Sequence, residues 1–133
     1  MSSVVSTRLE EDLLGTLEVP ADAYYGIQTL RALKNFNLSG VPLSEFPELV
    51  IGLAMVKQPA ADANHELGYL NSVKHAAITE ACTRIIGGEF HGQFVVDMIQ
   101  GGAGTSTNMN ANEVIANLGL EAMGRAKGEH QYL

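Results

Sequence analysis

The spacing of the apolar residues changes along this sequence, and that change limits the folds that it can adopt. Up to Pro20 the apolar residues lie in two short segments on either side of residues 12–15, as in a β-hairpin whose turn ends at Gly15. From Asp22 onward they recur three or four positions apart, which is the period of an amphipathic helix. The sequence therefore predicts a mainly α-helical fold with a small N-terminal β-hairpin.

Capping residues and helix breakers divide the helical part into four segments. We expect a first helix after Asp22 as its N-cap, and a second from about Glu48. A third is expected from Asn71 to Ile86, stopped by Gly87 and Gly88, and a fourth from near Asn108 to about Gly124.

Two places interrupt this pattern. Pro59 lies inside the second helix and removes a backbone donor, so we expect either a kink there or a helix split into two. Residues 90–99 fit neither period clearly and are interpreted as a short extended segment. Because a lone hairpin is marginally stable in water, the N-terminal hairpin is expected to pack on a helix.

Composition excludes several classes of protein. The net charge of −7 argues against a nucleic-acid surface, which needs a basic stripe. No apolar run is long enough for a membrane-spanning helix, and the first residues lack the pattern of a secretory signal, so a cytoplasmic protein is expected. Cys82 is alone, which excludes an internal disulfide and a cysteine-based zinc site.

No metal site is predicted from the sequence. The four histidines are not spaced like the ligands of a metal site. They are His65, His75, His91 and His130. The acidic run at residues 10–12 is typical of a solvated turn.

The glycine-rich run at residues 100–108 carries the strongest functional signal. Three glycines within four positions let a backbone approach a ligand closely, and hydroxyl side chains then follow at a helix N-terminus, where an anion is favoured. The spacing matches neither a dinucleotide-binding fingerprint nor a Walker loop. Two interpretations stay open, namely an anion-binding loop, or a plain turn with a helix cap.

Arg31 is a second candidate. It lies one residue away from the apolar face of the first expected helix, and arginine suits carboxylates. It could contact a substrate carboxylate, or it could form a salt bridge on the surface or between domains.

Two long segments resemble a known enzyme family. EEDLLGTLEVPADAYYGIQTLRALKNF at residues 10–36 and QGGAGTSTNMNANEVIANLGLE at residues 100–121 are similar to the N-terminal domain of the aspartate ammonia-lyases, in the aspartase/fumarase superfamily. The resemblance covers the chain from about Thr7 to Leu133. Class II fumarases carry GSGTQSNMN and WGAQTQRS in these places, and residues 103–108 and 25–31 agree better with the aspartases.

The resemblance implies the reversible removal of ammonia from L-aspartate to give fumarate. A general base takes a proton from Cβ, and the charge of the resulting carbanion spreads into the β-carboxylate as an aci-carboxylate. Oriented N–H and O–H donors stabilise such charge. By resemblance, Thr105 donates to the substrate, and Gly104, Ser106 and Asn108 shape the pocket.

The resemblance also implies parts that this sequence lacks. The flexible family loop similar to GSSxMPxKxNP, which holds the serine base and a substrate-binding lysine, is absent, as are the His-Thr and Ser-Thr-Asn motifs. We therefore expect residues 1–133 to be one N-terminal lyase domain without the central helical-bundle and C-terminal domains. Such a fragment has no catalytic residue of its own and is inactive alone. The parent is expected to be a homotetramer that requires no cofactor, with metal activation left open.

Two other functions stay open. A fumarase-type hydratase shares the carbanion chemistry but loses water instead of ammonia. A stand-alone helical module would instead bind a partner through its acidic surface.

Overall fold

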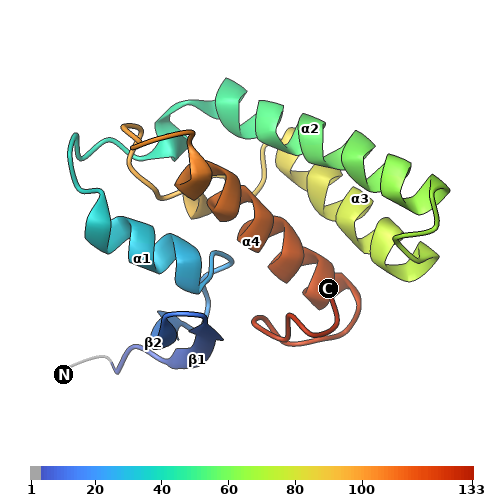
Figure 1. Ribbon diagram of the computed structural model, residues 1–133, viewed down its shortest axis with the longest axis horizontal. Coiled ribbons are helices and arrows are strands. Elements are labelled where there is room, and N and C mark those ends of the chain that lie inside the picture. The colour runs from blue at the N-terminus through green and yellow to red at the C-terminus, as the bar shows by residue number, and fades with distance from the viewer. Residues whose placement is uncertain (1–3) are drawn as a thin grey trace.

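Helix α4 runs through the middle of the molecule, with α1 on one side and the pair α2 and α3 on the other (Figure 1). The computed structural model describes residues 4–133. Along that part of the chain the elements are β1 (Thr7–Asp12), β2 (Gly15–Pro20), α1 (Ile27–Asn35), α2 (Pro47–Glu66), α3 (Ser72–Ile86) and α4 (Thr105–Ala122). Short 3-10 helices cover Leu43–Glu45 and His91–Gln93. The predicted mainly helical fold with an N-terminal hairpin is confirmed.

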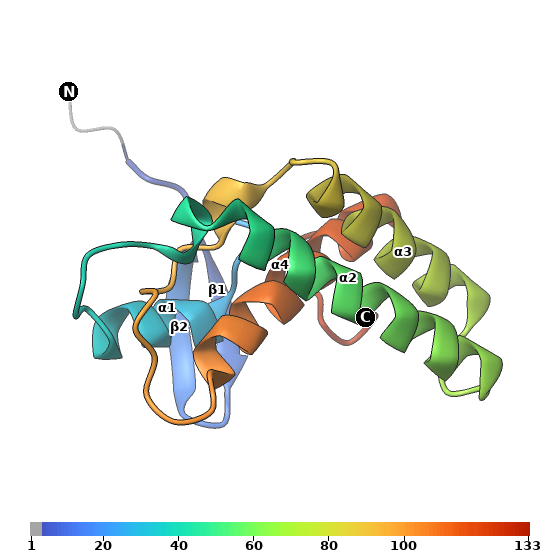
Figure 2. The same cartoon turned by 90° about the horizontal axis from the view of Figure 1, so that it is seen from above.

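The hairpin forms where the sequence predicts it. Strands β1 and β2 pair antiparallel, and Asp12 faces Gly15 across the turn. Gly15 has a φ of 114°, and the Asp12 carboxylate accepts the N–H of Leu14 at 2.9 Å. Val19 is fully buried in a small cluster with Ala23 and Ile27, so the hairpin packs on α1 as expected. Figure 2 shows the two strands beneath α1 and the start of α4.

Helix α1 begins at Ile27, so the prediction that Asp22 caps it is wrong. Its N-cap position is Gly26, which has no side chain to accept a hydrogen bond. The cap comes instead from α4, because the carboxylate of Glu113 accepts the N–H groups of Gln28 at 3.0 Å and Thr29 at 2.8 Å. A carboxylate at this position also interacts favourably with the positive end of the helix dipole.

Helix α2 continues through Pro59, so the alternative of a split helix is wrong. Pro47 occupies its first turn, where a missing N–H costs nothing. Pro59 itself is exposed, and so is Met55, whose carbonyl loses its helical partner. Water can satisfy that carbonyl, which explains why the helix continues.

Helix α3 has the cap that the sequence predicts. The side chain of Asn71 accepts the N–H of Lys74 at 2.9 Å. After the helix, Gly88 takes a left-handed conformation with φ 99°, whereas Gly87 stays right-handed. Helices α2 and α3 lie side by side in both views (Figures 1 and 2).

The main core lies between α2, α3 and α4 and is closed by the segment before α4. Residues 90–99 contribute Phe94 and Val96 to it, both almost fully buried. The extended segment expected there reduces to one antiparallel bridge between Pro42 and Asp97. No helix within residues 4–133 is both long and apolar enough to cross a membrane.

Candidate functional site

The glycine-rich loop leads directly into the N-terminus of α4. Gly102 and Gly104 are left-handed, with φ values of 67° and 75°. Gly104 is the N-cap and offers no side chain, and the helix starts at Thr105, three residues before the predicted start at Asn108. The left-handed glycine turns the chain into the helix earlier than the capping rule suggests. The first N–H groups of an 18-residue helix are thus left without a side-chain cap.

The structure brings four of the predicted site residues onto this first turn. Thr105 and Asn108 are exposed, whereas Gly104 and Ser106 are half-buried. The N–H of Asn108 closes the turn on the carbonyl of Gly104 at 3.1 Å, and its side-chain oxygen accepts from Lys57 Nζ at 2.5 Å. Lys57, on α2, is a cation near this turn that sequence reasoning missed.

A cavity of about 920 Å³ lies between the hairpin, α1 and α4. Ser106 lines it from α4, and Arg31 lines it from α1, so these two predicted residues share one space. The walls between them combine apolar residues such as Phe36 with polar ones such as Asn112. The other three residues of the first turn are not part of its lining.

Arg31 is held by a carboxylate of its own chain. Its Nε and Nη2 donate to the two oxygens of Asp12, each at 2.8 Å, and Nη2 also donates to the carbonyl of Gly15. This hydrogen-bonded guanidinium lowers the pKa of the Asp12 carboxyl below its usual value. The salt bridge weighed from the sequence is therefore present, and a substrate contact at Arg31 stays a prediction.

Asp97 fixes the start of the glycine-rich loop, and sequence reasoning missed it. Its Oδ2 accepts the N–H groups of Leu38, Ser39 and Gly40 at 3.1, 2.8 and 3.0 Å. Its Oδ1 accepts the hydroxyl of Ser39 at 2.7 Å and the N–H of Ile99 at 2.8 Å. These donors, led by the N–H of Ile99 and then the Ser39 hydroxyl, hold the pKa of Asp97 well below its usual range.

Asn110 fixes the same region from the α4 side. It is fully buried, its oxygen accepts the N–H of Val95 at 3.0 Å, and its amide donates to the carbonyl of Gln93 at 2.9 Å. The sequence gives no clear signal for it, because Asn110 shares its helix face with the polar residues Glu113 and Asn117. Together Asp97 and Asn110 hold both sides of the segment that precedes the loop.

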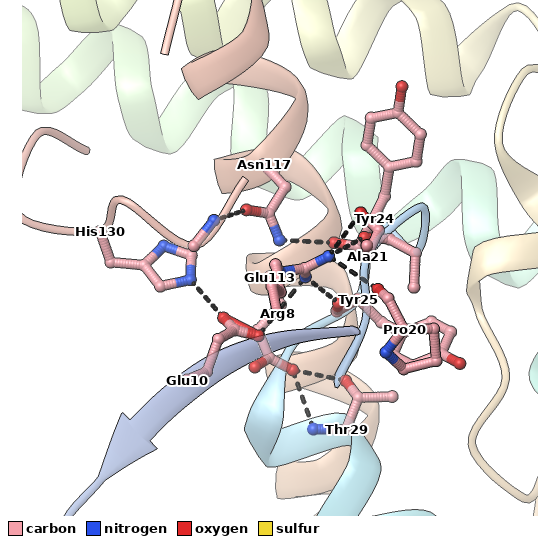
Figure 3. A network of polar contacts seen from close by, with 12 residues as sticks. Arg8, Glu10, Pro20, Ala21, Tyr24, Tyr25, Thr29, Glu113, Asn117 and His130 are labelled. Atoms are coloured by element: carbon pink, nitrogen blue, oxygen red, sulfur yellow. Dashed lines mark hydrogen bonds and ion pairs between the residues drawn. The ribbon is translucent and has the colours of Figure 1, made fainter. Parts of the chain in front are cut away.

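A second polar network ties the C-terminal segment to the hairpin (Figure 3). Glu10 is buried, and its carboxylate contacts His130 Nε2 at 3.0 Å and the Arg8 guanidinium at 3.4 Å. Arg8 also donates to the backbone carbonyls of Ala23 at 2.7 Å and Tyr25 at 2.8 Å. This network fixes the turn before α1 and thereby the wall of the cavity.

Within residues 4–133 no three His, Cys, Asp or Glu side chains lie close enough together to hold a metal ion. The nearest histidine pair is stacked, with the rings of His65 and His75 4.4 Å apart and nearly parallel. His75 is engaged with Asp62 at 2.6 Å, and His65 with the carbonyl of Leu70 at 2.8 Å. These residues do not fit a divalent cation site.

Comparison with known proteins defines the family. A family model described as Lyase matches residues 15–133. An aspartate ammonia-lyase from Pseudomonas aeruginosa is 76% identical over 133 residues, which are 100% of this chain and 28% of that protein. This chain therefore belongs to the lyase family, in the aspartase/fumarase superfamily. It spans about 28% of the length of that relative.

Solved structures give the same result for the fold. The fumarate lyase:delta crystallin from Brucella melitensis bound to cobalt matches with a TM-score of 0.95 and 58% identity, over 96% of this chain and 28% of that chain. A class II fumarase from Schistosoma mansoni matches with a TM-score of 0.83 and 38% identity, over 93% of this chain and 26% of that chain.

Proposed function

We propose that this chain supplies one wall of the substrate site of an aspartate ammonia-lyase, which converts L-aspartate reversibly to fumarate and ammonia. The observation that carries the proposal is the open first turn of α4, where uncapped N–H groups stand beside the exposed hydroxyl of Thr105. Such a turn suits a carboxylate, because oriented donors and the positive helix end both favour negative charge. The 76% identity to an aspartate ammonia-lyase supports the choice of substrate.

In the transition state this turn would have to stabilise the negative charge that develops on the substrate. Removal of the Cβ proton leaves an electron pair that moves into the β-carboxylate, and ammonia then leaves from Cα as the double bond forms. Donors that strengthen toward that carboxylate as its charge grows lower the barrier. Thr105 is proposed to donate through its hydroxyl, while Gly104 and Ser106 shape the pocket and Asn108 stays in place through Lys57.

Other parts of the reaction belong to segments outside this chain. The general base is not among residues 1–133 in this proposal, so the 133-residue chain alone is expected to be inactive. We propose that it is the N-terminal domain of a homotetrameric cytoplasmic enzyme that requires no cofactor. Activation of the parent enzyme by a divalent cation stays open in this proposal.

A fumarase-type hydratase is the second candidate, and the TM-score of 0.83 to a class II fumarase favours keeping it. The higher identity to an aspartate ammonia-lyase supports the ammonia-lyase instead. A stand-alone helical module would be favoured by a native reading frame that ends at Leu133.

A chimera tests the proposal. In it this chain replaces the matching 133 residues of the Pseudomonas aeruginosa enzyme, and activity is followed by the ultraviolet absorbance of fumarate. We expect fumarate from aspartate and none from malate. Formation of fumarate from malate would favour the hydratase, and an inactive but folded tetrameric chimera would contradict both.

Thr105→Ala in the same chimera tests the role of the loop. Loss of one preorganised donor to developing charge is expected to lower kcat by about 10²–10³-fold, whereas Thr105→Ser, which keeps a hydroxyl, should retain most activity. Asn71→Ala is the matched control, because it removes the N-cap of α3 at a cost of about 1 kcal/mol of stability and should leave kcat unchanged. A Thr105→Ala variant with a lower melting temperature and normal kcat would make Thr105 a structural residue only.

A further inference from the structure

We propose that Asp97 is a positioning residue for the ammonia-lyase reaction. By this proposal it sets where the glycine-rich loop lies over the first turn of α4. The inference rests on the proposed function, since the loop matters to the reaction only if the substrate binds there. Asp97 itself is not proposed to touch the substrate.

The Asp97 carboxylate is held almost completely by hydrogen bonds. It is only 5% exposed, and its two oxygens accept five hydrogen bonds. Four of the donors come from residues 38–40, and the fifth is the N–H of Ile99. One side chain therefore fixes two loops that are 57 to 59 residues apart in sequence.

The attachment at Asp97 extends to the glycine-rich loop through the residues that follow it. The Gln100 side chain donates to the carbonyl of Asp97 at 2.7 Å, and the N–H of Met98 donates to the carbonyl of Val41 at 2.9 Å. Residues 97–100 are thus tied to residues 38–41 through Asp97 and Met98, and Gln100 folds back onto Asp97. The next four residues include two left-handed glycines and lead straight into Thr105. Because residues 101–104 lack large side chains to hold them, their position depends on the attachment at Asp97 and on α4.

A small displacement of the loop is expected to have a large effect on the reaction rate. Misplacement of catalytic groups by about 1 Å can cost about 10²-fold in rate. Loss of the carboxylate would free the loop while the core of α4 stays held by Asn110. Since the donors act mainly on charge that grows in the transition state, the loss is expected in kcat with KM nearly unchanged.

Hydrogen exchange tests the positioning itself, independently of catalysis. In Asp97→Asn, one acceptor oxygen becomes an amide donor that faces backbone N–H groups. The amides of residues 38–40 and 98–104 are expected to exchange faster, while those of the middle of α4 keep their protection. Unchanged exchange in residues 98–104 would overturn the inference whatever the reaction.

Kinetics in the chimera test the consequence. Asp97→Asn is expected to lower kcat for aspartate by about 10²-fold. Ser39→Ala, which removes one of the five hydrogen bonds, should give a smaller loss in the same direction even if Asp97→Asn folds poorly. The control is Asn117→Ala, which removes two hydrogen bonds of a fully buried side chain farther along α4 and should leave kcat unchanged.

The outcomes separate this inference from the proposed function. If Thr105→Ala abolishes turnover and neither Asp97→Asn nor Ser39→Ala lowers kcat, the proposed function stands and the role of Asp97 is overturned. If Asp97→Asn and Asn117→Ala lower kcat equally, Asp97 acts only through stability, and the inference is again overturned. If Thr105→Ala keeps normal turnover, the proposed function of the loop fails, and the kinetic role of Asp97 fails with it.

Discussion

The carboxylate of Glu113 lies against the backbone of Gly26 and caps α1 from a different helix. A Cβ at residue 26 would overlap Glu113 Oε2 and would lie 3.1 Å from Glu10 Oε1. The φ of Gly26 is −123°, so the backbone conformation does not require glycine. Glycine is required by the close approach of the carboxylate, which accepts the N–H groups of Gln28 and Thr29 and the Thr29 hydroxyl.

Gly26→Ala is therefore expected to lower the free energy of unfolding by about 2 kcal/mol. The added methyl group displaces the carboxylate from its donors, and each hydrogen bond to a charged group contributes about 1.5–3 kcal/mol. Urea denaturation of the 133-residue chain measures the change. Gly52→Ala is the control, because a Cβ there meets nothing within 4 Å, and alanine in a helix should add about 0.5–1 kcal/mol. Equal destabilisation by both variants would contradict this explanation.

Glu113→Gln is expected to destabilise the chain by about 2 kcal/mol for a related reason. The amide keeps the size of the side chain, but its NH2 group replaces one acceptor oxygen and then faces a backbone N–H group. The buried polar groups that lose their partner cost about 1–3 kcal/mol of stability. Both variants damage the same cap, so the double variant with Gly26→Ala should cost less than the sum. A double-mutant cycle measures this, and strict additivity would show that Gly26 acts elsewhere.

A fall in pH is expected to lower the free energy of unfolding, because the Asp97 carboxylate becomes protonated. Its pKa is lowered in the folded chain, so its stabilising contribution is complete above the unfolded-state pKa of about 3.9. That contribution is lost as the pH falls from there through the folded-state pKa, because the unfolded chain then binds the proton more readily. Urea midpoints should fall more steeply below about pH 4 in the unmodified chain than in Asp97→Asn. Parallel curves for the two proteins would rule out this contribution.

Helix α2 exposes several large apolar side chains in this chain, among them Met55 and Val56. Val56 is 66% exposed, whereas Val50, on the same helix, is fully buried. Val56→Glu should change stability by less than about 0.5 kcal/mol and should reduce both the binding of a hydrophobic dye and self-association in light scattering. Val50→Glu should unfold the chain, because it buries an unpaired charge. If the unmodified chain is a monomer that does not bind the dye, the explanation by an exposed apolar surface is contradicted.

Local signals predicted the elements whose ends are set by neighbouring residues. The turn at Gly15 and the cap at Asn71 depend on contacts within three residues, and both are confirmed. The start of α1 could not be predicted, because its cap is Glu113, 84 residues from Thr29. Asp22 has the right residue type for an N-cap, but the helix begins five residues later.

The candidate site also combines residues that local sequence signals indicate with residues that depend on distant partners. The glycine-rich loop and its hydroxyls were visible in the sequence, because a ligand loop and a helix cap use the same local residues. Asp97, Asn110 and Lys57 were missed, because each holds the loop or its helix through partners 14 to 59 residues away. A single polar residue within an apolar segment, as at Asp97, is the signal that could have indicated that residue, whereas Asn110 lies among other polar residues and nothing in the sequence marks it.

The contact between Glu10 and His130 joins positions 120 residues apart, and this separation has a consequence for synthesis on the ribosome. Glu10 and the start of α1 are made long before their partners His130 and Glu113. Contacts so distant in sequence form slowly, because closing a long loop costs chain entropy before any contact is gained. During translation α1 therefore lacks its cap, and Glu10 lacks its histidine partner, until residues 113–130 have been made, and a pause in that interval leaves this part of the chain open to chaperones and proteases.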